Sequence, residues 1–421
     1  MLQELIRDIK RLEPIRAEGQ VSGLEGLRIE ATGPKSALRL GALARIGAID
    51  GVRAELVGFK GANGIFLTCE EGGDIYPGAP VFFEAGGNSL YPCHSWLGRI
   101  VNPFGLPMDG GPDLPKGGYA KPIIAPPPPA HSRNRVSEKL HLGVRVMDLF
   151  TPCGQGQRLG LFAGSGVGKS TLMGMLAQGA DADVVVIGLI GERGREVREF
   201  VEDALGPAGL ARSVVVTATS DAPAPARRRA AYAALTVAEY FRDQGKQVLC
   251  LLDSVTRFAM AQREIGLAAG EPPTTRGYTP SVFAELPKLL ERAGPGRKGS
   301  GDITGLFTVL VDGDDHNEPV ADAVRGILDG HIVMSRHIAE RGRYPAVDLL
   351  KSLSRLASAL HGPEEAALVR EVRRLASTYA DMEELIRIGA YSSGADKDVD
   401  RAIRLMDGLN AFLTQSERDP T

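Results

Sequence analysis

The residues with the clearest chemistry lie in the segment RLGLFAGSGVGKST at residues 158–171. The spacing from Ala163 through four residues to Gly168, Lys169 and Ser170 is that of a phosphate-binding loop, with alanine where the first glycine usually stands. Glycines let such a loop turn tightly, so that backbone N–H groups and a helix N-terminus point at phosphate oxygens. Lys169 supplies charge for the β- and γ-phosphates, and the Ser170 hydroxyl can ligate Mg²⁺. The sequence therefore predicts that a nucleoside triphosphate is bound by Gly164, Ser165, Gly166, Val167, Gly168, Lys169, Ser170 and Thr171.

Two acidic residues follow predicted strands and could supply what hydrolysis needs beyond phosphate binding. Asp253 ends the apolar run VLCLL at residues 248–252, and Glu192 follows the apolar run at residues 184–190. In a doubly wound sheet, residues at the carboxyl ends of the strands lie over the nucleotide crevice. Asp253 suits the water shell of a bound metal, and Glu192 suits the orientation of the attacking water. An ordinary surface carboxylate is the alternative for Glu192.

Tyr344 and Arg355 stand in the segment RYPAVDLLKSLSRL at residues 343–356. Pro345 restricts the backbone beside Tyr344, so this ring could stack on a nucleobase, and a core tyrosine is the alternative. Arg355 could donate positive charge across a subunit boundary, although a single arginine is usually solvated. Both residues are therefore candidates whose roles depend on where the fold places them.

Strand-like and helical segments alternate between residues 144 and 344 and would position these groups. Apolar runs at residues 159–162, 184–190, 214–217, 248–253 and 305–311 predict strands, and the segments between them are long enough for crossover helices. Such alternation predicts a parallel sheet with helices on both faces. Beyond residue 349, apolar residues at three- and four-residue spacing predict helices at 364–379, 382–388 and 398–414.

The N-terminal part of the chain has a different pattern. Residues 1–13 place leucines and isoleucines on one helical face, and Pro14 ends that helix. The helix either packs on its own domain or binds a partner protein, and the second is favoured because a short terminal helix has little core to join. Short alternating runs between residues 19 and 95 predict a small closed β-barrel that serves assembly. Residues 97–111 predict a link that doubles back and carries no chemistry.

Composition argues against several classes of protein. The 421 residues are 43% hydrophobic and 24% charged with a net charge of -3, as in soluble globular proteins, and this balance gives no reason to expect a nucleic-acid partner. Cys69, Cys93, Cys153 and Cys250 never form a C-x-x-C pair, so neither a zinc site nor a disulfide framework is expected. The sequence lacks a membrane-length apolar run and a signal-peptide pattern, which predicts a cytosolic protein, peripheral to a membrane at most.

Four stretches together resemble the hexameric rotary-type ATPases, the family that includes the catalytic subunits of ATP synthases. They are GLFAGSGVGKST, GLIGERGRE, CLLDSVTRFA and RYPAVDLLKSLSRLAS. Within this family the chain is most similar to the type III export ATPases, and specifically to their flagellum-specific branch, through residues 272–294 and 312–333. The resemblance implies an α/β fold with a RecA-like P-loop core. It divides the chain into a partner-binding helix at 1–18, a β-barrel hexamerisation domain at 19–95, an ATPase domain at 96–348 and a helical domain at 349–421.

The resemblance also implies roles for single residues, matched position by position. Lys169 and Ser170 hold phosphate and Mg²⁺, and Asp253 holds the metal through its water shell. Glu192 activates the lytic water, and Arg193 steadies the γ-phosphate region. Tyr344 lies against adenine, and Arg355 reaches the neighbouring subunit's nucleotide as an arginine finger. The implied cofactors are ATP and Mg²⁺, in a homohexamer whose sites form only at subunit interfaces.

The partners that the resemblance implies belong to an export apparatus at the inner membrane. They are a stator-like regulator on the N-terminal helix, a central-stalk-like protein, membrane proteins of the export gate, and export substrates with their chaperones. No nucleic acid is expected. The favoured function is ATP hydrolysis that powers type III export of flagellar proteins. Injectisome export, a synthase catalytic subunit, a regulatory subunit without turnover and a nucleic-acid translocase are the alternatives.

Two features qualify this assignment. Residues 388–400 lack the acidic loop of synthase catalytic subunits, and the chain ends soon after Phe412, so recognition of the base depends on Tyr344. Arg227, Arg228 and Arg229 begin a predicted helix, where their charge opposes the helix dipole. An ion-pair role at an interface and a solvated face are both open for these three arginines.

Overall fold

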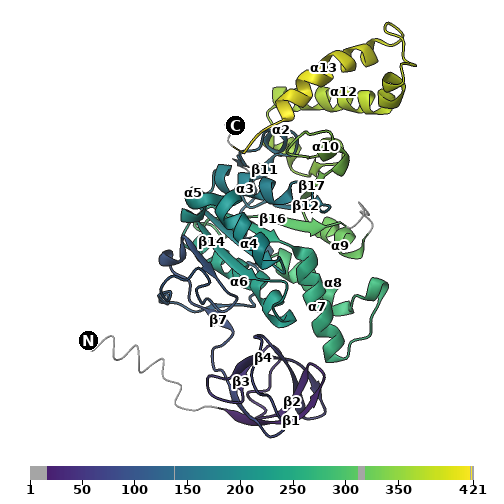
Figure 1. The fold of residues 1–421 in the computed structure, drawn as a ribbon. Coiled ribbons are helices and arrows are strands. Elements are labelled where there is room, and N and C mark those ends of the chain that lie inside the picture. Colours follow the sequence, from purple (N-terminus) through teal and green to yellow (C-terminus); the bar gives the residue numbers. More distant parts are fainter. Residues whose placement is uncertain (1–16, 137, 312–317, 418, 420–421) are drawn as a thin grey trace.

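A computed structural model describes residues 17–136, 138–311, 318–417 and 419, so the helix predicted at residues 1–13 lies outside the described part of the chain. Figure 1 shows a barrel at one end, a sheet covered by helices in the middle and a pair of helices at the other end. The catalytic candidates therefore have to be placed by the middle part, which follows the barrel in the sequence.

The barrel is built from short strands whose alternate side chains fill its interior. Its six strands pair in the closed order β1-β2-β5-β4-β3-β6. They are β1 (Glu18–Glu25), β2 (Arg28–Thr32), β3 (Leu43–Ile46), β4 (Val52–Lys60), β5 (Asn63–Thr68) and β6 (Pro80–Phe83). Inward-facing residues such as Ile29, Ala31, Ala54 and Leu56 are buried, at two-residue spacing along each strand. The predicted small closed barrel is thus confirmed.

The central sheet has eight strands in the order β18-β17-β12-β16-β15-β13-β14-β8. They are β8 (Arg99–Val101), β12 (Arg158–Ala163), β13 (Val184–Ile190), β14 (Ser213–Ala218), β15 (Val248–Asp253), β16 (Ile303–Leu310), β17 (Gly330–Met334) and β18 (Leu353–Ser354). All neighbours run parallel except β18, which pairs antiparallel with β17. The five predicted strands are confirmed, whereas β8, β17 and β18 were not predicted.

Strand β8 corrects the prediction that residues 97–111 only link two domains. Arg99, Ile100 and Val101 pair with Val214, Val215 and Val216 of β14 at the edge of the sheet. A three-residue strand is too short to show an alternating pattern, and glycine and proline nearby are typical of a loop. The pairing with β14 is what makes this segment a strand.

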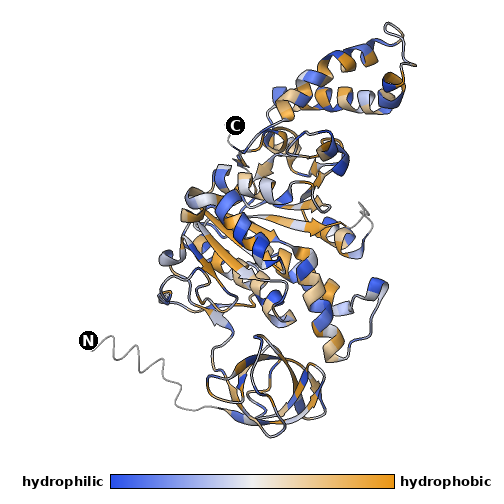
Figure 2. Ribbon diagram, in the orientation of Figure 1, coloured by the Kyte–Doolittle hydropathy of each residue, from blue (hydrophilic) through white to orange (hydrophobic). Residues whose placement is uncertain are grey.

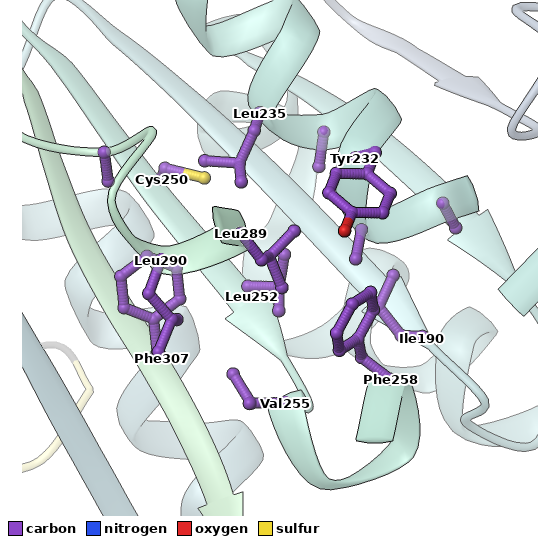
Figure 3. Packing of buried hydrophobic residues seen from close by; sticks show 14 of the residues in the cluster. Ile190, Tyr232, Leu235, Cys250, Leu252, Val255, Phe258, Leu289, Leu290 and Phe307 are labelled. Carbon is purple, nitrogen blue, oxygen red and sulfur yellow. The ribbon is translucent and has the colours of Figure 1, made fainter. Parts of the chain in front are cut away.

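Helices cover both faces of the sheet because successive strand residues point in opposite directions. In β13, Val184, Val186 and Ile190 join one buried cluster, whereas Val185 and Leu189 join the other. Figure 3 shows the first cluster, in which Leu252 and Phe307 of the sheet lie against side chains from the covering helices. Figure 2 shows that hydrophobic residues dominate the central strands. The predicted two-sided parallel sheet is confirmed.

The helices of the core connect these strands or extend them. They are α2 (Arg145–Phe150), α3 (Lys169–Gly179), α4 (Gly194–Glu199), α5 (Gly206–Ala211), α6 (Ala224–Asp243), α7 (Val255–Ala269), α8 (Pro280–Leu290), α9 (Pro319–Ile327), α10 (Arg336–Glu340) and α11 (Ala357–Leu360), with a π-helical segment at Phe200–Leu205 between α4 and α5. Two small antiparallel pairs complete the core: β7 (Ser89–Leu90) with β9 (Lys121–Pro122), and β10 (Lys139–Leu140) with β11 (Cys153–Gly154).

The C-terminal part is a pair of packed helices, α12 (Pro363–Arg387) and α13 (Lys397–Leu413). Helix α12 runs through residues 380–381, where the sequence had predicted a break between two helices. These positions are Ala380 and Asp381, and neither is a proline or glycine that would end a helix. No helix in the described part of the chain is long and apolar enough to span a membrane.

Candidate active site

The phosphate-loop sequence forms a tight turn between β12 and α3. Helix α3 begins at Lys169, directly after Gly168, whose φ of 88° lies in the left-handed region that favours glycine. Gly166 has a φ of 76° for the same reason. Val167 is buried and anchors the loop to the core, whereas Ser165 is exposed. The turn therefore leaves the N-terminus of α3 facing outward, as a phosphate site requires.

Three charged side chains converge at the carboxyl edge of the sheet. The Nζ atom of Lys169 lies 2.5 Å from Oδ1 of Asp253 and 3.7 Å from Oε1 of Glu192. Asp253 ends β15 and Glu192 follows β13, so neighbouring parallel strands deliver both carboxylates to the loop after β12. All three side chains are at most 14% exposed. The sequence predicted each residue, and the fold brings them together.

The Glu192 carboxyl titrates near neutral pH. Its burial and the negative charge of Asp253 raise its pKa to about 7, and the positive charge of Lys169 opposes that rise. Its Oε1 atom is buried and has no hydrogen-bond partner among the described residues. A buried carboxylate oxygen without a donor, beside a phosphate loop, suits a group that accepts a proton from a water molecule.

Thr308 completes the cluster and was not predicted. Its hydroxyl donates a hydrogen bond of 2.6 Å to Oδ1 of Asp253 from the neighbouring strand β16. One signal in the sequence could have identified it, namely a polar residue inside the otherwise apolar run GLFTVLV. A buried threonine within a strand usually needs a hydrogen-bond partner, and here that partner is the carboxylate.

Tyr344 lies beside the loop rather than in the core. Its side chain is partly exposed, and it lines an open cleft of about 480 Å³ with Ser165, Gly166, Arg336 and other residues. A β-carbon built on Gly168 would meet the Tyr344 ring at 3.4 Å, so the ring packs against the loop itself. The C-terminal tail reaches this place too, because the backbone N–H of Gln415 donates to the Tyr344 carbonyl over 2.9 Å.

Two predicted residues are not brought to the cluster within this chain. The side chain of Arg193 is 76% exposed and pairs with Glu196 at 3.2 Å. Arg355 is exposed and follows β18, which pairs with Gly330 at the amino end of β17. The phosphate loop follows the carboxyl end of β12, which runs parallel to β17. Arg355 therefore lies at the amino ends of the parallel strands, whereas the phosphate loop lies at their carboxyl ends.

The oxygen donors at this edge fit Mg²⁺ shared with a nucleotide. Mg²⁺ in such sites keeps several waters and takes one or two protein ligands in addition to phosphate oxygens. Ser170 is exposed in the first turn of α3. Asp253 ends β15, which is separated by β16 alone from β12, the strand that leads into the loop. In the described ranges, no group of three or more His, Cys, Asp or Glu side chains could hold a metal by itself. One hydroxyl and one carboxylate are the ligand types that a nucleotide-bound ion needs.

Two of the three arginines near the start of α6 connect the core to the N-terminal domain, and the third pairs within the core. Arg228 forms an ion pair with the buried Glu55 of β4. Arg229 is 5% exposed and donates to the Gly87 carbonyl over 2.7 Å. Arg227 pairs with Glu264 of α7 at 2.6 Å. The interface ion pair is thus confirmed for Arg228, which joins two domains of the same chain, whereas Arg227 pairs within the core and Arg229 forms hydrogen bonds. The solvated face is wrong, since all three side chains are largely buried.

The sheet and the residues at the ends of its strands indicate what kind of protein this is. A phosphate loop after one parallel strand, with carboxylates after two neighbouring strands at the same edge, is the arrangement of P-loop nucleoside triphosphatases. Comparison with known proteins specifies the family. A model of the ATP synthase alpha/beta family, nucleotide-binding domain, matches residues 143–354, and a model of the T3SS EscN ATPase C-terminal domain matches residues 362–421.

Individual relatives agree with these family models over nearly the full length of the chain. The flagellum-specific ATP synthase of Caulobacter vibrioides is 56% identical over 427 residues, covering 100% of this chain and 96% of the relative. The structure of the assembled ATPase EscN from the type III secretion system of enteropathogenic E. coli superposes with a TM-score of 0.89 at 42% identity, covering 96% of both chains. EscN in complex with its central stalk EscO gives a TM-score of 0.87 at 41% identity, again covering 96% of both.

The chain belongs to the ATP synthase alpha/beta family, in the branch of flagellum-specific and type III secretion ATPases. The resemblance stated from the sequence motifs, the RecA-like core with its N-terminal barrel and C-terminal helices, and the predicted ATPase activity are thereby confirmed.

Proposed function

We propose that this ATPase works as a homohexameric ring that hydrolyses ATP with Mg²⁺ and thereby powers type III export of flagellar proteins. The observation that carries the proposal is the convergence of Lys169, Glu192 and Asp253 beside the phosphate loop. The proposed domains are the N-terminal helix at 1–18, the barrel at 19–95, the ATPase domain at 96–348 and the helical domain at 349–421.

Each of the proposed site residues has its own task in the reaction. Backbone N–H groups of the loop and Lys169 would bind the phosphates, and Ser170 and Asp253 would hold Mg²⁺, the latter through water. Bound Mg²⁺ supplies positive charge that neutralises the β- and γ-phosphates. Glu192 orients the attacking water and takes its proton, for which its raised pKa suits it. Arg193 turns from Glu196 to the γ-phosphate.

Recognition of the base falls to Tyr344, whose exposed ring flanks the loop. Offset stacking of an aromatic ring on adenine contributes of the order of 1–3 kcal/mol, and it discriminates little between bases. The cleft beside Ser165 and Gly166 is where the nucleotide would extend from the loop to the ring.

The ring is proposed because Arg355 lies at the edge of the sheet away from its own phosphate loop. In a closed cyclic assembly, one edge of each subunit meets the opposite edge of the next. Arg355 would then act on the neighbouring subunit's nucleotide as an arginine finger. The similarity to EscN, whose structure was determined as the assembled ATPase, supports this arrangement.

The proposed partners are those of an export apparatus. The EscN complex with its central stalk EscO supports a stalk-like protein in the ring. A stator-like regulator on the N-terminal helix, the membrane proteins of the export gate, and export substrates with their chaperones complete the proposal, with a location in the cytoplasm at the inner-membrane export base. The match to the EscN C-terminal domain favours injectisome export as the second candidate.

The test separates these two candidates in living cells. Replacing Lys169 by alanine in the chromosomal copy removes the charge that binds the phosphates, and we expect loss of external flagellar filaments and of swimming. Lys298→Ala, on an exposed turn away from the site, is the matched control. Loss of secreted effectors with normal swimming would move the chain to the injectisome, and normal function of both systems would refute the export role.

A further inference from the structure

The carboxylate of Asp253 is held by two donors that meet on one of its oxygens. Lys169 lies 2.5 Å from Oδ1, and the Thr308 hydroxyl lies 2.6 Å from the same atom. Both contacts leave Oδ2 to other partners. The geometry of this pair therefore fixes which oxygen of Asp253 remains available at the carboxyl edge of the sheet.

The sheet register places Thr308 at this carboxylate. Leu252 pairs with Phe307 across β15 and β16, so the next residues, Asp253 and Thr308, are adjacent. Thr308 is 1% exposed, and its hydroxyl has a second possible acceptor in the Leu252 carbonyl at 3.4 Å. The contact to Asp253 is much the shorter of the two, so the Thr308 hydroxyl donates its hydrogen bond to the Asp253 carboxyl group.

The two donors differ in whether they keep their contact with Asp253 when a nucleotide binds. Lys169 has a flexible side chain that the phosphates attract when a nucleotide binds, as its place in the phosphate loop requires. Thr308 has a short β-branched side chain with few rotamers, on a strand buried between β12 and β15. After Lys169 turns to the phosphates, Thr308 is the donor that still holds Oδ1.

We propose that Thr308 is a positioning residue, whose hydroxyl fixes Oδ1 of Asp253 so that Oδ2 faces the water shell of the magnesium nucleotide. This inference rests on the proposed role of Asp253 toward the metal. The hydroxyl acts only through Asp253, and it touches neither the nucleotide nor the attacking water.

The test compares variants of Thr308 in the full chain by the binding of a fluorescent ADP analogue, titrated with Mg²⁺. Thr308→Val keeps the shape of the side chain and removes the donor. We expect the Mg²⁺ concentration for half-maximal binding to rise about tenfold, as the loss of a hydrogen bond to a charged group implies. Binding in excess EDTA should stay unchanged, because the phosphate loop is intact. Thr308→Ser restores the donor and should return the Mg²⁺ requirement to within about twofold of the original.

Thr217→Val is the matched control. Thr217 is a buried threonine of β14 in the same sheet, and its hydroxyl has no hydrogen-bond partner among the described residues. This control removes a buried hydroxyl without touching Asp253, so the Mg²⁺ requirement should not change. If Thr308→Val proves unfolded by circular dichroism, Thr308→Ala takes its place with the same expected shift.

Asp253→Asn separates failure of this inference from failure of the proposed function. A raised Mg²⁺ requirement in Asp253→Asn with none in Thr308→Val would overturn the role of Thr308 and leave the metal role of Asp253 in place. An unchanged requirement in Asp253→Asn would refute the metal role itself, and the inference with it. Equal shifts in Thr308→Val and Thr308→Ser would also overturn the inference, since the hydroxyl would then not be the cause.

Discussion

At the scale of single residues, the site is governed by how two buried carboxylates share one lysine. Lys169 contacts Asp253 closely, whereas its distance to Glu192 is 3.7 Å, so its positive charge attracts Asp253 more strongly than Glu192. Glu192 keeps a buried oxygen without a donor in the described part of the chain, and its pKa rises to about 7. Asp253 thus has the closer contact with the lysine, while Glu192 can exchange a proton near neutral pH.

The raised pKa of Glu192 predicts the pH dependence of ATP hydrolysis. Below pH 7 the carboxyl is protonated and cannot accept a proton, so kcat/KM should rise about tenfold per pH unit and level off above about pH 7. Glu192→Gln should bind ATP yet lose about 10²–10⁴-fold in kcat, together with this rising limb. Phosphate release measured over the pH range checks both effects.

The control for this prediction is Glu199→Gln. Glu199 is an exposed carboxylate of α4 that pairs with Arg195, so its loss should leave the pH profile unchanged. Normal turnover of Glu192→Gln would show that another group activates the water.

At the scale of elements, helix α6 connects parts that are distant in the sequence. Its second turn contacts the N-terminal domain through Arg228 and Arg229, in spite of the unfavourable dipole near a helix N-terminus. Its last turns hold Glu239, which forms two hydrogen bonds with the fully buried guanidinium of Arg292 after α8. Arg292 also donates to Thr236 over 3.0 Å. Buried charges of opposite sign therefore fix α6 against the segment that follows α8.

Removing one partner of the buried pair should be costly. Arg292→Ala leaves the Glu239 carboxylate buried without its cation, and we expect a loss of about 3–5 kcal/mol in the free energy of unfolding. The double variant Arg292→Met with Glu239→Leu removes both charges and should recover most of that loss. Urea unfolding of the three proteins, followed by circular dichroism, measures the difference.

An exposed ion pair provides the comparison. Arg195→Ala breaks the i,i+4 pair with Glu199, whose side chains are 76% and 52% exposed, and should cost less than about 0.5 kcal/mol. If Arg292→Ala cost no more than this, the buried pair would not be what holds α6 in place.

At the scale of the whole molecule, the residues proposed for the active site lie at opposite ends of the parallel strands. Lys169 stands at the carboxyl edge, whereas Arg355 is exposed at the other edge and donates to the Arg325 carbonyl over 3.3 Å. The chain also closes on itself, because Gln415 after α13 bonds to the Tyr344 carbonyl and accepts a hydrogen bond from the Arg145 backbone. The C-terminal helices are therefore linked to Tyr344, whose aromatic side chain is proposed to bind the base.

The shared site predicts complementation between two inactive variants. Lys169→Ala lacks the phosphate-binding charge and Arg355→Ala lacks the finger, so each protein alone should hydrolyse ATP at least about 10³-fold more slowly. In rings assembled from an equal mixture, about one interface in four combines an intact Lys169 with an intact Arg355 from the next subunit. Activity should return to about that fraction, measured as phosphate release after mixing and reassembly.

Two results bear on this prediction. Mixing the double variant Lys169→Ala with Arg355→Ala against either single variant should restore nothing, because no interface then holds both residues. Full activity of Arg355→Ala alone would refute a finger shared between subunits.

The loop, the strands that flank it and the two carboxylates could all be predicted from the sequence. These follow from local spacing: glycines before Gly168-Lys169-Ser170, and apolar runs that end in Asp253 or precede Glu192. Each signal depends on a few neighbouring residues, and the structure keeps those neighbours together in β12, β13 and β15. The barrel and the two-sided sheet could be predicted for the same reason.

Contacts between residues distant in the sequence could not be predicted and depend on the packed fold. Thr308 contacts Asp253 because β16 lies between β12 and β15 in the sheet, an order that no local pattern encodes. Arg292 finds Glu239 across 53 positions, and the short strand β8 exists only through its pairing with β14. The placement of Arg355 at the far edge likewise follows from the antiparallel pairing of β18 with β17. Such contacts depend on the free energy of the packed fold, which sums over the whole chain rather than over any one segment.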